Sequence, residues 1–284
     1  MEVKSLDAKQ GEETSRPQPA HDLPLNEKGR YYHLDCGPGD FAPYVLTCGD
    51  PDRARRLARL LDRLEVRRRY REFLTFTGDY HRIPVSVMAT GIGPDNTAIA
   101  MVEAAQCASP LTFIRLGSCG ALQPHIQVGD LVITAEALRD EHTTQYYAPD
   151  TGPVPAHPDV LHALIQAATE LQAPHHVGVT CTTSDFYAGQ GRQVPGFPTV
   201  ESDKVERLHR AGVLNLEMEM SVYLALARVS SYSLRAGGVC AVFTNRVTGD
   251  RAFGLKRRRR QAERLLLAVG LRALEILHAR DHGL

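Results

Sequence analysis

Strand-like runs and helical stretches alternate along most of the chain, and this alternation restricts the fold more than any other feature of the sequence. Short apolar runs that end at glycine or proline are followed by segments whose apolar residues recur every three or four positions. This order is typical of an α/β domain, in which helices cover both faces of a mainly parallel or mixed sheet. The sequence therefore predicts a three-layer α/β/α sandwich with a central mixed β-sheet.

The expected elements are defined by these patterns. Strands are predicted at residues 44–48, 73–80, 83–89, 113–117, 130–135, 176–182 and 236–245. Helices are predicted at residues 52–64, 96–108, 158–172, 218–229 and 256–278. The strands at 73–80 and 83–89 are expected to form a hairpin.

Composition limits the domain organisation and the kind of partner. Residues 1–30 are polar and lack apolar periodicity, which predicts a disordered N-terminal extension before one domain at residues 31–284. The formal net charge is zero, which argues against general nucleic-acid binding. No segment approaches the length of a membrane span. The six cysteines are scattered and include no C-x-x-C pair, which fits reduced thiols in a cytoplasmic protein. The histidines form no metal-binding motif, so we expect no transition-metal site.

One predicted strand carries an arginine in its middle. Residues 112–123 read T-F-I-R-L-G-S-C-G-A-L-Q, and we expect the strand to end at Gly117 in a tight turn. A buried guanidinium is costly unless an anion meets it. Arg115, the turn and the Ser118 hydroxyl together suit a phosphate or a carboxylate. The alternative is an arginine at a strand end that points into water.

Two glycine-containing segments follow other predicted strands. Gly49-Asp50-Pro51-Asp52-Arg53 opens a helix, where backbone N–H groups and Arg53 would attract an anion. Taken alone, such a segment is more often an ordinary strand-to-helix turn. Residues 90–94, T-G-I-G-P, allow close backbone approach but do not complete the G-x-G-x-x-G pattern of dinucleotide sites.

Two polar segments suit an uncharged ligand. Glu217 and Glu219 are two positions apart, so in extended chain both carboxylates would face one cleft and accept sugar hydroxyls. Taken alone, they fit better as the acidic start of a helix. Phe186, Gln190 and Arg192 offer a ring, an amide and a guanidinium, which suit a flat heterocycle with carbonyl groups. The alternative is a polar surface loop.

Together these segments resemble the nucleoside phosphorylase family, and most closely its uridine phosphorylase branch. The resemblance runs from about His33 to the C-terminus, and its motifs occur in the family's order. They are G-D-P-D-R at 49–53, R-E-F at 71–73, T-G-I-G at 90–93, R-L-G-S-C-G-A-L-Q-P-H-I-Q-V-G-D at 115–130, H-V-G-V-T at 176–180, F-Y-A-G-Q-G-R at 186–192, N-L-E-M-E-M at 215–220 and N-R at 245–246.

The resemblance implies a role for each candidate residue. Phosphate would be held by Gly49, Arg53, Arg115 and Ser118, and in the neighbouring subunit by Arg71. Ribose would be bound by Glu217, Met218 and Glu219, and across a dimer interface by His33. The base would be bound by Gly120, Phe186, Gln190 and Arg192. In relatives, a monovalent cation lies near the positions of Glu72, Ile92 and Asn96.

The implied reaction is the phosphorolysis of uridine to uracil and ribose 1-phosphate, with Arg115, Gln190, Arg192 and Glu219 as the catalytic set. Phosphate is a co-substrate, and no cofactor is expected apart from K⁺ at a dimer interface. The strand at 236–245 ends in Asn245-Arg246 and lacks the aspartate of purine-specific relatives. The resemblance implies a homo-oligomer built from dimers, commonly a hexamer. The alternatives are a purine nucleoside phosphorylase, a nucleosidase of the same fold, and a non-catalytic nucleoside-binding protein.

Overall fold

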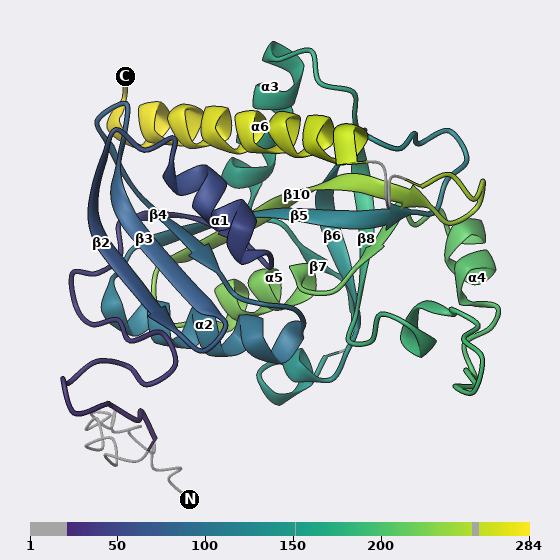
Figure 1. Cartoon of the computed structure of the whole chain (residues 1–284), viewed down its shortest axis with the longest axis horizontal. Coiled ribbons are helices and arrows are strands. Elements are labelled where there is room, and N and C mark those ends of the chain that lie inside the picture. Colours follow the sequence, from purple (N-terminus) through teal and green to yellow (C-terminus); the bar gives the residue numbers. More distant parts are fainter. Residues whose placement is uncertain (1–21, 151, 252–255) are drawn as a thin grey trace, which may run out of the picture.

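A central sheet lies between two layers of helices (Figure 1). The computed structural model describes residues 22–150, 152–251 and 256–284. Helices α1, α3 and α6 cover one face of the sheet, and α2 and α5 cover the other. The predicted three-layer α/β/α sandwich with a mixed sheet is therefore confirmed.

The described elements have the following bounds. The strands are β1 (Tyr44–Cys48), β2 (Arg63–Tyr70), β3 (Phe73–Tyr80), β4 (Ile83–Ala89), β5 (Leu111–Ala121), β6 (Leu131–Asp140), β7 (Val154–Pro155), β8 (His175–Thr183), β9 (Asn215–Glu217) and β10 (Leu234–Asn245). The helices are α1 (Pro51–Ala58), α2 (Pro94–Cys107), α3 (Pro158–Glu170), α4 (Lys204–Arg210), α5 (Met220–Val229) and α6 (Lys256–His282). Short 3₁₀ turns are η1 (Thr143–Tyr146) and η2 (Ala188–Gln190).

Part of the sheet closes on itself. The strand order is β10-β6-β8-β9-β5-β1-β4-β3-β2, and β10 also pairs with β5. Strands β10, β6, β8, β9 and β5 thus form a closed ring, from which β1, β4, β3 and β2 extend as an open sheet. Strand β1 is parallel to both β4 and β5, whereas β3 and β4 form the predicted antiparallel hairpin.

Alternating side chains of the central strands supply two hydrophobic cores. On β1, Leu46 packs toward α1, α3 and α6, while Val45 packs toward α2 and α5. Successive residues of a strand point to opposite faces, so a strand covered on both faces is apolar throughout. This explains why all five residues of β1 are buried and why its bounds match the prediction.

Several predicted boundaries are wrong, and strand β6 runs to Asp140 rather than to residue 135. The helix expected at 52–64 ends at Ala58, and residues 63–70 form the edge strand β2. Strand β2 buries none of its eight residues and carries four arginines, so it lacks the apolar alternation of a strand. Strand β5 continues to Ala121, so the tight turn expected at Gly117 does not form. Helix α5 begins at Met220, two residues later than expected.

The first described residues already contact the domain. In the part of the predicted extension that the structure describes, Leu25 bridges to Tyr31, and Asn26 donates a hydrogen bond to Asp35 over 2.8 Å. Residues 1–21 lie outside the described residues. All six cysteines are buried and unpaired. Within the described helices, none has the length and apolarity needed to span a bilayer.

Candidate active site

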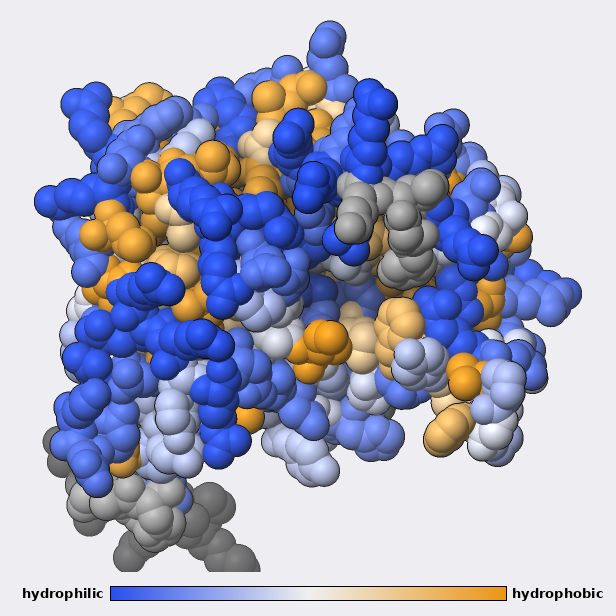
Figure 2. Space-filling model, in the orientation of Figure 1, coloured by the Kyte–Doolittle hydropathy of each residue, from blue (hydrophilic) through white to orange (hydrophobic). Residues whose placement is uncertain are grey.

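A cavity of about 680 Å³ collects most of the predicted site residues. It opens where β1, β5 and β9 end, and the surface shows a hollow with hydrophilic residues inside it near the middle of this face (Figure 2). From the predicted set, its lining includes Gly49, Arg53, Glu72, Ile92, Asn96, Arg115, Ser118, Gly120, Phe186, Gln190, Arg192, Glu217, Met218 and Glu219. Segments far apart in the sequence therefore converge on one site, whereas His33 and Arg71 do not line it.

Arg115 is the centre of a buried ion-pair cluster. Its Nε donates to Glu217 Oε2 over 3.0 Å, and its Nη2 forms a short ion pair with Glu219 Oε2. All three side chains are at most 5% exposed. Burial alone would lower the pKa of Arg115, but the charges of Glu219 and Glu217 outweigh burial and raise it. The cluster holds two carboxylates against one guanidinium, so Glu217 and Glu219 share a contact with Arg115 that the sequence analysis did not predict.

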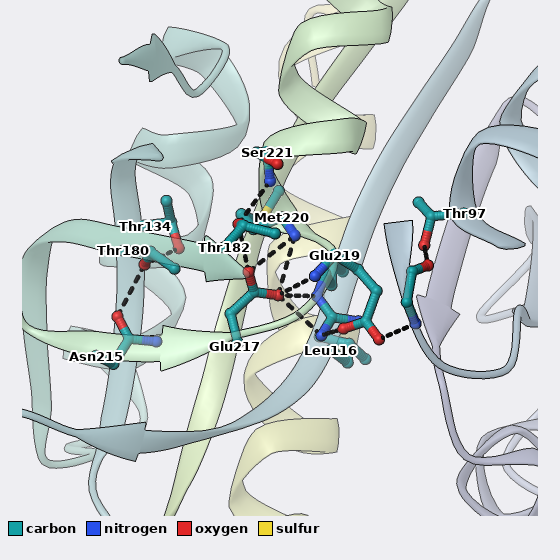
Figure 3. Close-up of polar contacts among 12 residues, drawn as sticks. Thr97, Leu116, Thr134, Thr180, Thr182, Asn215, Glu217, Glu219, Met220 and Ser221 are labelled. Carbon is teal, nitrogen blue, oxygen red and sulfur yellow. Dashed lines mark hydrogen bonds and ion pairs between the residues drawn. The ribbon is translucent and has the colours of Figure 1, made fainter. Parts of the chain in front are cut away.

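The backbone fixes the two carboxylates in place. Glu217 accepts hydrogen bonds from the N–H groups of Glu219 and Met220 and from the Thr182 hydroxyl (Figure 3). Glu219 accepts from the N–H of Gly93, 2.8 Å away in the T-G-I-G turn. Burial, together with the charge of Glu217, raises the pKa of Glu219, although Arg115 opposes the shift. The glycine turn at 90–93 therefore positions a carboxylate rather than a dinucleotide.

A second buried arginine lies beside the first. Arg53, in the first turn of α1, donates from Nη1 to the carbonyl of Leu116 over 3.0 Å and from Nη2 to Glu263 over 3.2 Å. Gly49 precedes this turn, and a Cβ there would lie 2.7 Å from the carbonyl oxygen of Gly91, so only glycine fits.

Two donor atoms of this arginine pair lack a partner. Arg53 Nε and Arg115 Nη1 are buried and have no hydrogen-bond partner within the described part of the chain. Buried donors are normally paired, and arginine donors match the oxygens of phosphate and carboxylate. Because β5 pairs with β10 beyond Gly117, the strand and not a turn presents the Ser118 hydroxyl. The geometry therefore supports an anion site built from side chains.

The opposite part of the cavity suits a planar ring. Phe186 is half exposed, and the Arg192 guanidinium lies 4.4 Å from its ring centroid. Gln190 is buried, and its backbone carbonyl oxygen accepts a hydrogen bond from Arg246 Nη2 over 3.0 Å. Burial lowers the pKa of Arg192, and burial together with Arg192 lowers that of Arg246 to about 10. Phe243 and Thr244 complete this part of the lining.

His33 and Arg71 lie together outside the cavity. The Arg71 guanidinium lies 5.7 Å from the centroid of the Tyr32 ring, and that ring is 5.1 Å from the ring of His33. His33 Nδ1 is 2.6 Å from Glu103 Oε1, which holds the imidazole from α2. Arg71 lines a smaller neighbouring pocket that shares Glu72 with the main cavity.

Four residues that the sequence analysis did not place support the site. Thr182 bonds to Glu217, and Glu263 bonds to Arg53. Glu103 bonds to His33, and Arg246 bonds to the backbone of Gln190. Glu103 sits among apolar residues of α2, whereas Glu263 follows the arginine run of α6, and a buried carboxylate requires a charged or hydrogen-bonding partner. That was the available signal, but it does not identify the partner. No group of three or more metal-ligating His, Cys, Asp or Glu side chains occurs among the residues described.

The phosphorylase superfamily model matches residues 43–275. The chain belongs to the phosphorylase superfamily. All residues that line the cavity fall inside the matched range, whereas His33 precedes it. The resemblance inferred from the motifs is thus confirmed.

Several proteins that are similar to this chain are named uridine phosphorylases. It is 46% identical to a uridine phosphorylase of Thermococcus kodakarensis over 231 residues, 80% of this chain and 82% of the relative. It is 37% identical to uridine phosphorylase of Escherichia coli over 77% of this chain and 87% of the relative. The solved structure of uridine phosphorylase from Vibrio fischeri superimposes with a TM-score of 0.76 at 26% identity, covering 88% of this chain and 96% of that one.

Proposed function

We propose that this protein is a uridine phosphorylase, which converts uridine and phosphate to uracil and ribose 1-phosphate. The observation that carries the proposal is the pair of buried arginines whose free donors, Arg53 Nε and Arg115 Nη1, face no partner in the described chain. A hydrolase of the same fold activates neutral water and has no anion to bind. Two partnerless buried guanidinium donors in one cavity are explained by a phosphate co-substrate.

Phosphate binds at the ends of β1 and β5. Gly49, Arg53, Arg115 and Ser118 line this part of the cavity and supply the donors. Holding phosphate in a fixed position beneath the sugar removes the entropy cost of bringing two substrates together. A phosphate oxygen forms a bond to C1′ of the ribose while the C1′–N1 bond breaks. The electron pair of the C1′–N1 bond leaves with uracil.

The carboxylates stabilise the sugar in the transition state. Glu217, Met218 and Glu219 line the same cavity as the phosphate donors and the ring-binding residues. Glu219 accepts ribose hydroxyls, and the cluster has one carboxylate more than guanidinium groups. Positive charge develops on the ribose as the glycosidic bond breaks, so a preorganised negative charge nearby lowers the barrier.

The leaving uracil needs donors for its developing negative charge. Phe186 offers a ring for stacking, while Gln190 and Arg192 donate to the carbonyl oxygens, with Gly120 leaving space beneath the base. The lining contains no aspartate near the end of β10 that could protonate a purine. This favours a pyrimidine over a purine nucleoside.

The active site is shared between subunits of a homo-oligomer built from dimers, in which His33 reaches the ribose and Arg71 the phosphate of the neighbour. Their placement together, outside the cavity of their own chain, supports this arrangement. Glu72, Ile92 and Asn96 lie at the rim of that cavity and hold K⁺ at the dimer interface. The six buried thiols fit a cytoplasmic setting.

A substrate assay tests the function. The protein is incubated with uridine, thymidine, inosine or adenosine, each with and without phosphate. We expect uracil release from uridine that requires phosphate, with ribose 1-phosphate formed in equal amount. Equal rates in phosphate-free buffer would favour a nucleosidase, and preference for inosine or adenosine would favour a purine nucleoside phosphorylase. Nucleoside binding without turnover would indicate a non-catalytic protein.

A further inference from the structure

A second concave site lies between α1 and α6, outside the cavity described above. It is a groove of about 700 Å³ on the face where the two helices lie near each other (Figure 1). Six arginines line it: Arg55 and Arg56 from α1, Arg59 directly after that helix, and Arg259, Arg260 and Arg264 from α6. We call this the arginine groove.

The helical spacing aims these arginines at one another. Positions 52, 55 and 56 on α1, and position 59 at its C-terminal cap, follow the three- and four-residue spacing of a single helix face. On α6, positions 259, 260, 263, 264 and 267 do the same. The two faces meet across the groove, so the positive charges are gathered there rather than spread around the helices.

The acidic residues of the groove neutralise only part of this charge. The lining holds two carboxylates, Asp52 and Glu263, which leaves an excess of four positive charges. Arg55 pairs with Asp52, and Arg56 pairs with Asp50 and Glu263 at 3.2 Å each.

The remaining four arginines, Arg59, Arg259, Arg260 and Arg264, have no ion pair with any described residue. Arg56 Nε is buried and without a hydrogen-bond partner in the same part of the chain. Mutual repulsion of these groups would be relieved by a bound polyanion.

We propose that the arginine groove binds the triphosphate group of a small molecule, and that its occupancy weakens phosphate binding in the main cavity. The binding stands on the groove alone. The effect on the main cavity rests on the proposed function, because it assumes that Arg53 holds the phosphate co-substrate.

The dimensions and chemistry of the groove select a linear triphosphate. The first and last arginines of the groove on α6 are five positions apart, about 7.5 Å along the helix, which exceeds what a single phosphate group can reach. Guanidinium forks match phosphate oxygens. Among the described residues, the lining contains no aromatic side chain on which a base could stack, which disfavours single-stranded nucleic acid. The groove therefore recognises the triphosphate chain that inorganic tripolyphosphate and a nucleoside triphosphate share.

Glu263 connects the groove to the main cavity. Its Oε1 accepts from Arg53 and its Oε2 from Arg56, so one carboxylate joins the two sites. When a triphosphate takes Arg56, Glu263 is left to Arg53 alone. Arg53 then offers less positive charge to phosphate, and the negative charge of the bound triphosphate acts in the same direction. Binding at either site should weaken binding at the other by the same factor.

Isothermal titration calorimetry on the full-length protein tests the binding. Inorganic tripolyphosphate and uridine triphosphate are titrated separately at constant ionic strength, with sodium sulfate as the anion control and a ten-residue oligouridylate as the nucleic-acid control. Both triphosphates should bind more tightly than sulfate. Binding of the nucleotide alone would show that a base is recognised and would overturn the proposal. So would tighter binding of the oligouridylate than of either triphosphate.

Matched variants locate the binding. The double substitution Arg59→Gln/Arg264→Gln removes two exposed arginines of the groove. The control Arg210→Gln/Arg228→Gln removes two exposed arginines elsewhere and gives the same net charge. The groove variant should bind tripolyphosphate at least tenfold more weakly than the control variant. Unchanged binding would place the ligand in the main cavity and overturn the proposal.

The kinetic effect uses the same variants. Saturating tripolyphosphate should raise the KM for phosphate about fivefold in the natural protein and the control variant. In the groove variant the KM without tripolyphosphate should be unchanged, and the increase should be lost. An increase that persists in the groove variant would show direct competition in the main cavity and would overturn the coupling. If no phosphorolysis occurs at all, the proposed function fails while the calorimetry still decides on the groove.

Discussion

Replacing Arg115 with methionine removes the charge at the centre of the active-site cluster and keeps a side chain of similar length. Glu217 and Glu219, which are 0% and 5% exposed, would lose their shared guanidinium. Removing one partner of a buried ion pair costs about 3–5 kcal/mol because the other charge stays buried without compensation. We expect a loss of stability in this range for Arg115→Met.

The loss should depend on pH. Burial raises the pKa of Glu219, and Arg115 is the main cause that opposes this shift. Without Arg115 the folded-state pKa rises further above the unfolded value. A group of this kind contributes stability below the unfolded pKa, near 4.3 for glutamate, and the contribution is lost as pH rises through the folded pKa. The deficit of Arg115→Met should therefore be larger at pH 8 than at pH 5.

Urea unfolding measures both effects. The chain has no tryptophan, so far-UV circular dichroism is the appropriate signal, at one protein concentration because an oligomer's stability depends on concentration. The control is Arg210→Met, whose arginine is 74% exposed and pairs with Glu206 on α4. Its change should stay within about 0.5 kcal/mol. A free energy of unfolding for Arg115→Met within about 1 kcal/mol of that of the control at both pH values would show that the cluster does not contribute the stability assigned to it.

Three further outcomes follow from the same site. Arg192→Ala should raise the KM for uridine about tenfold and leave the KM for phosphate unchanged, because it removes a donor at the base end only; equal changes in both constants would contradict this. Thr182→Val should lower the free energy of unfolding by about 1–3 kcal/mol, because Glu217 loses a buried hydrogen bond, and a neutral result in urea unfolding would show that water replaces it. Mixing inactive His33→Ala and Glu219→Ala subunits should restore activity as mixed dimers form; mixed dimers without activity would place both residues in a single-chain site.

The sequence predicts the buried elements of the fold well and its exposed elements poorly. Strands β1, β3 and β4 match their predicted bounds because packing on the sheet gives them long buried runs. Strand β2 could not be found, since its arginines show no apolar face and its position is fixed by pairing with β3. Charged residues on such an edge strand hinder pairing with other chains, so the feature that hides the strand also protects it.

The sequence likewise predicted only part of the candidate site. Motifs identified the side chains that line the cavity, because most of these motifs lie within a buried strand or shortly after one. The sequence did not show that Glu217 and Glu219 would share Arg115, or that Glu263 would hold Arg53 from a helix 210 positions away. Such partners depend on tertiary packing, and local spacing carries no information about them.

The pairing of each buried arginine with a carboxylate also explains how this cavity can exist before substrates bind. A guanidinium in a closed interior must have a counter-charge. For Arg115 that charge comes from Glu217 and Glu219, and for Arg53 from Glu263. The partners of Arg115 line the cavity, where, under the proposed function, their excess charge acts on the ribose. The partner of Arg53 lies toward the surface, where it also holds Arg56. The same requirement of burial thus links Arg115 to the proposed chemistry, and it links Arg53, through Glu263, to the proposed ligand of the arginine groove.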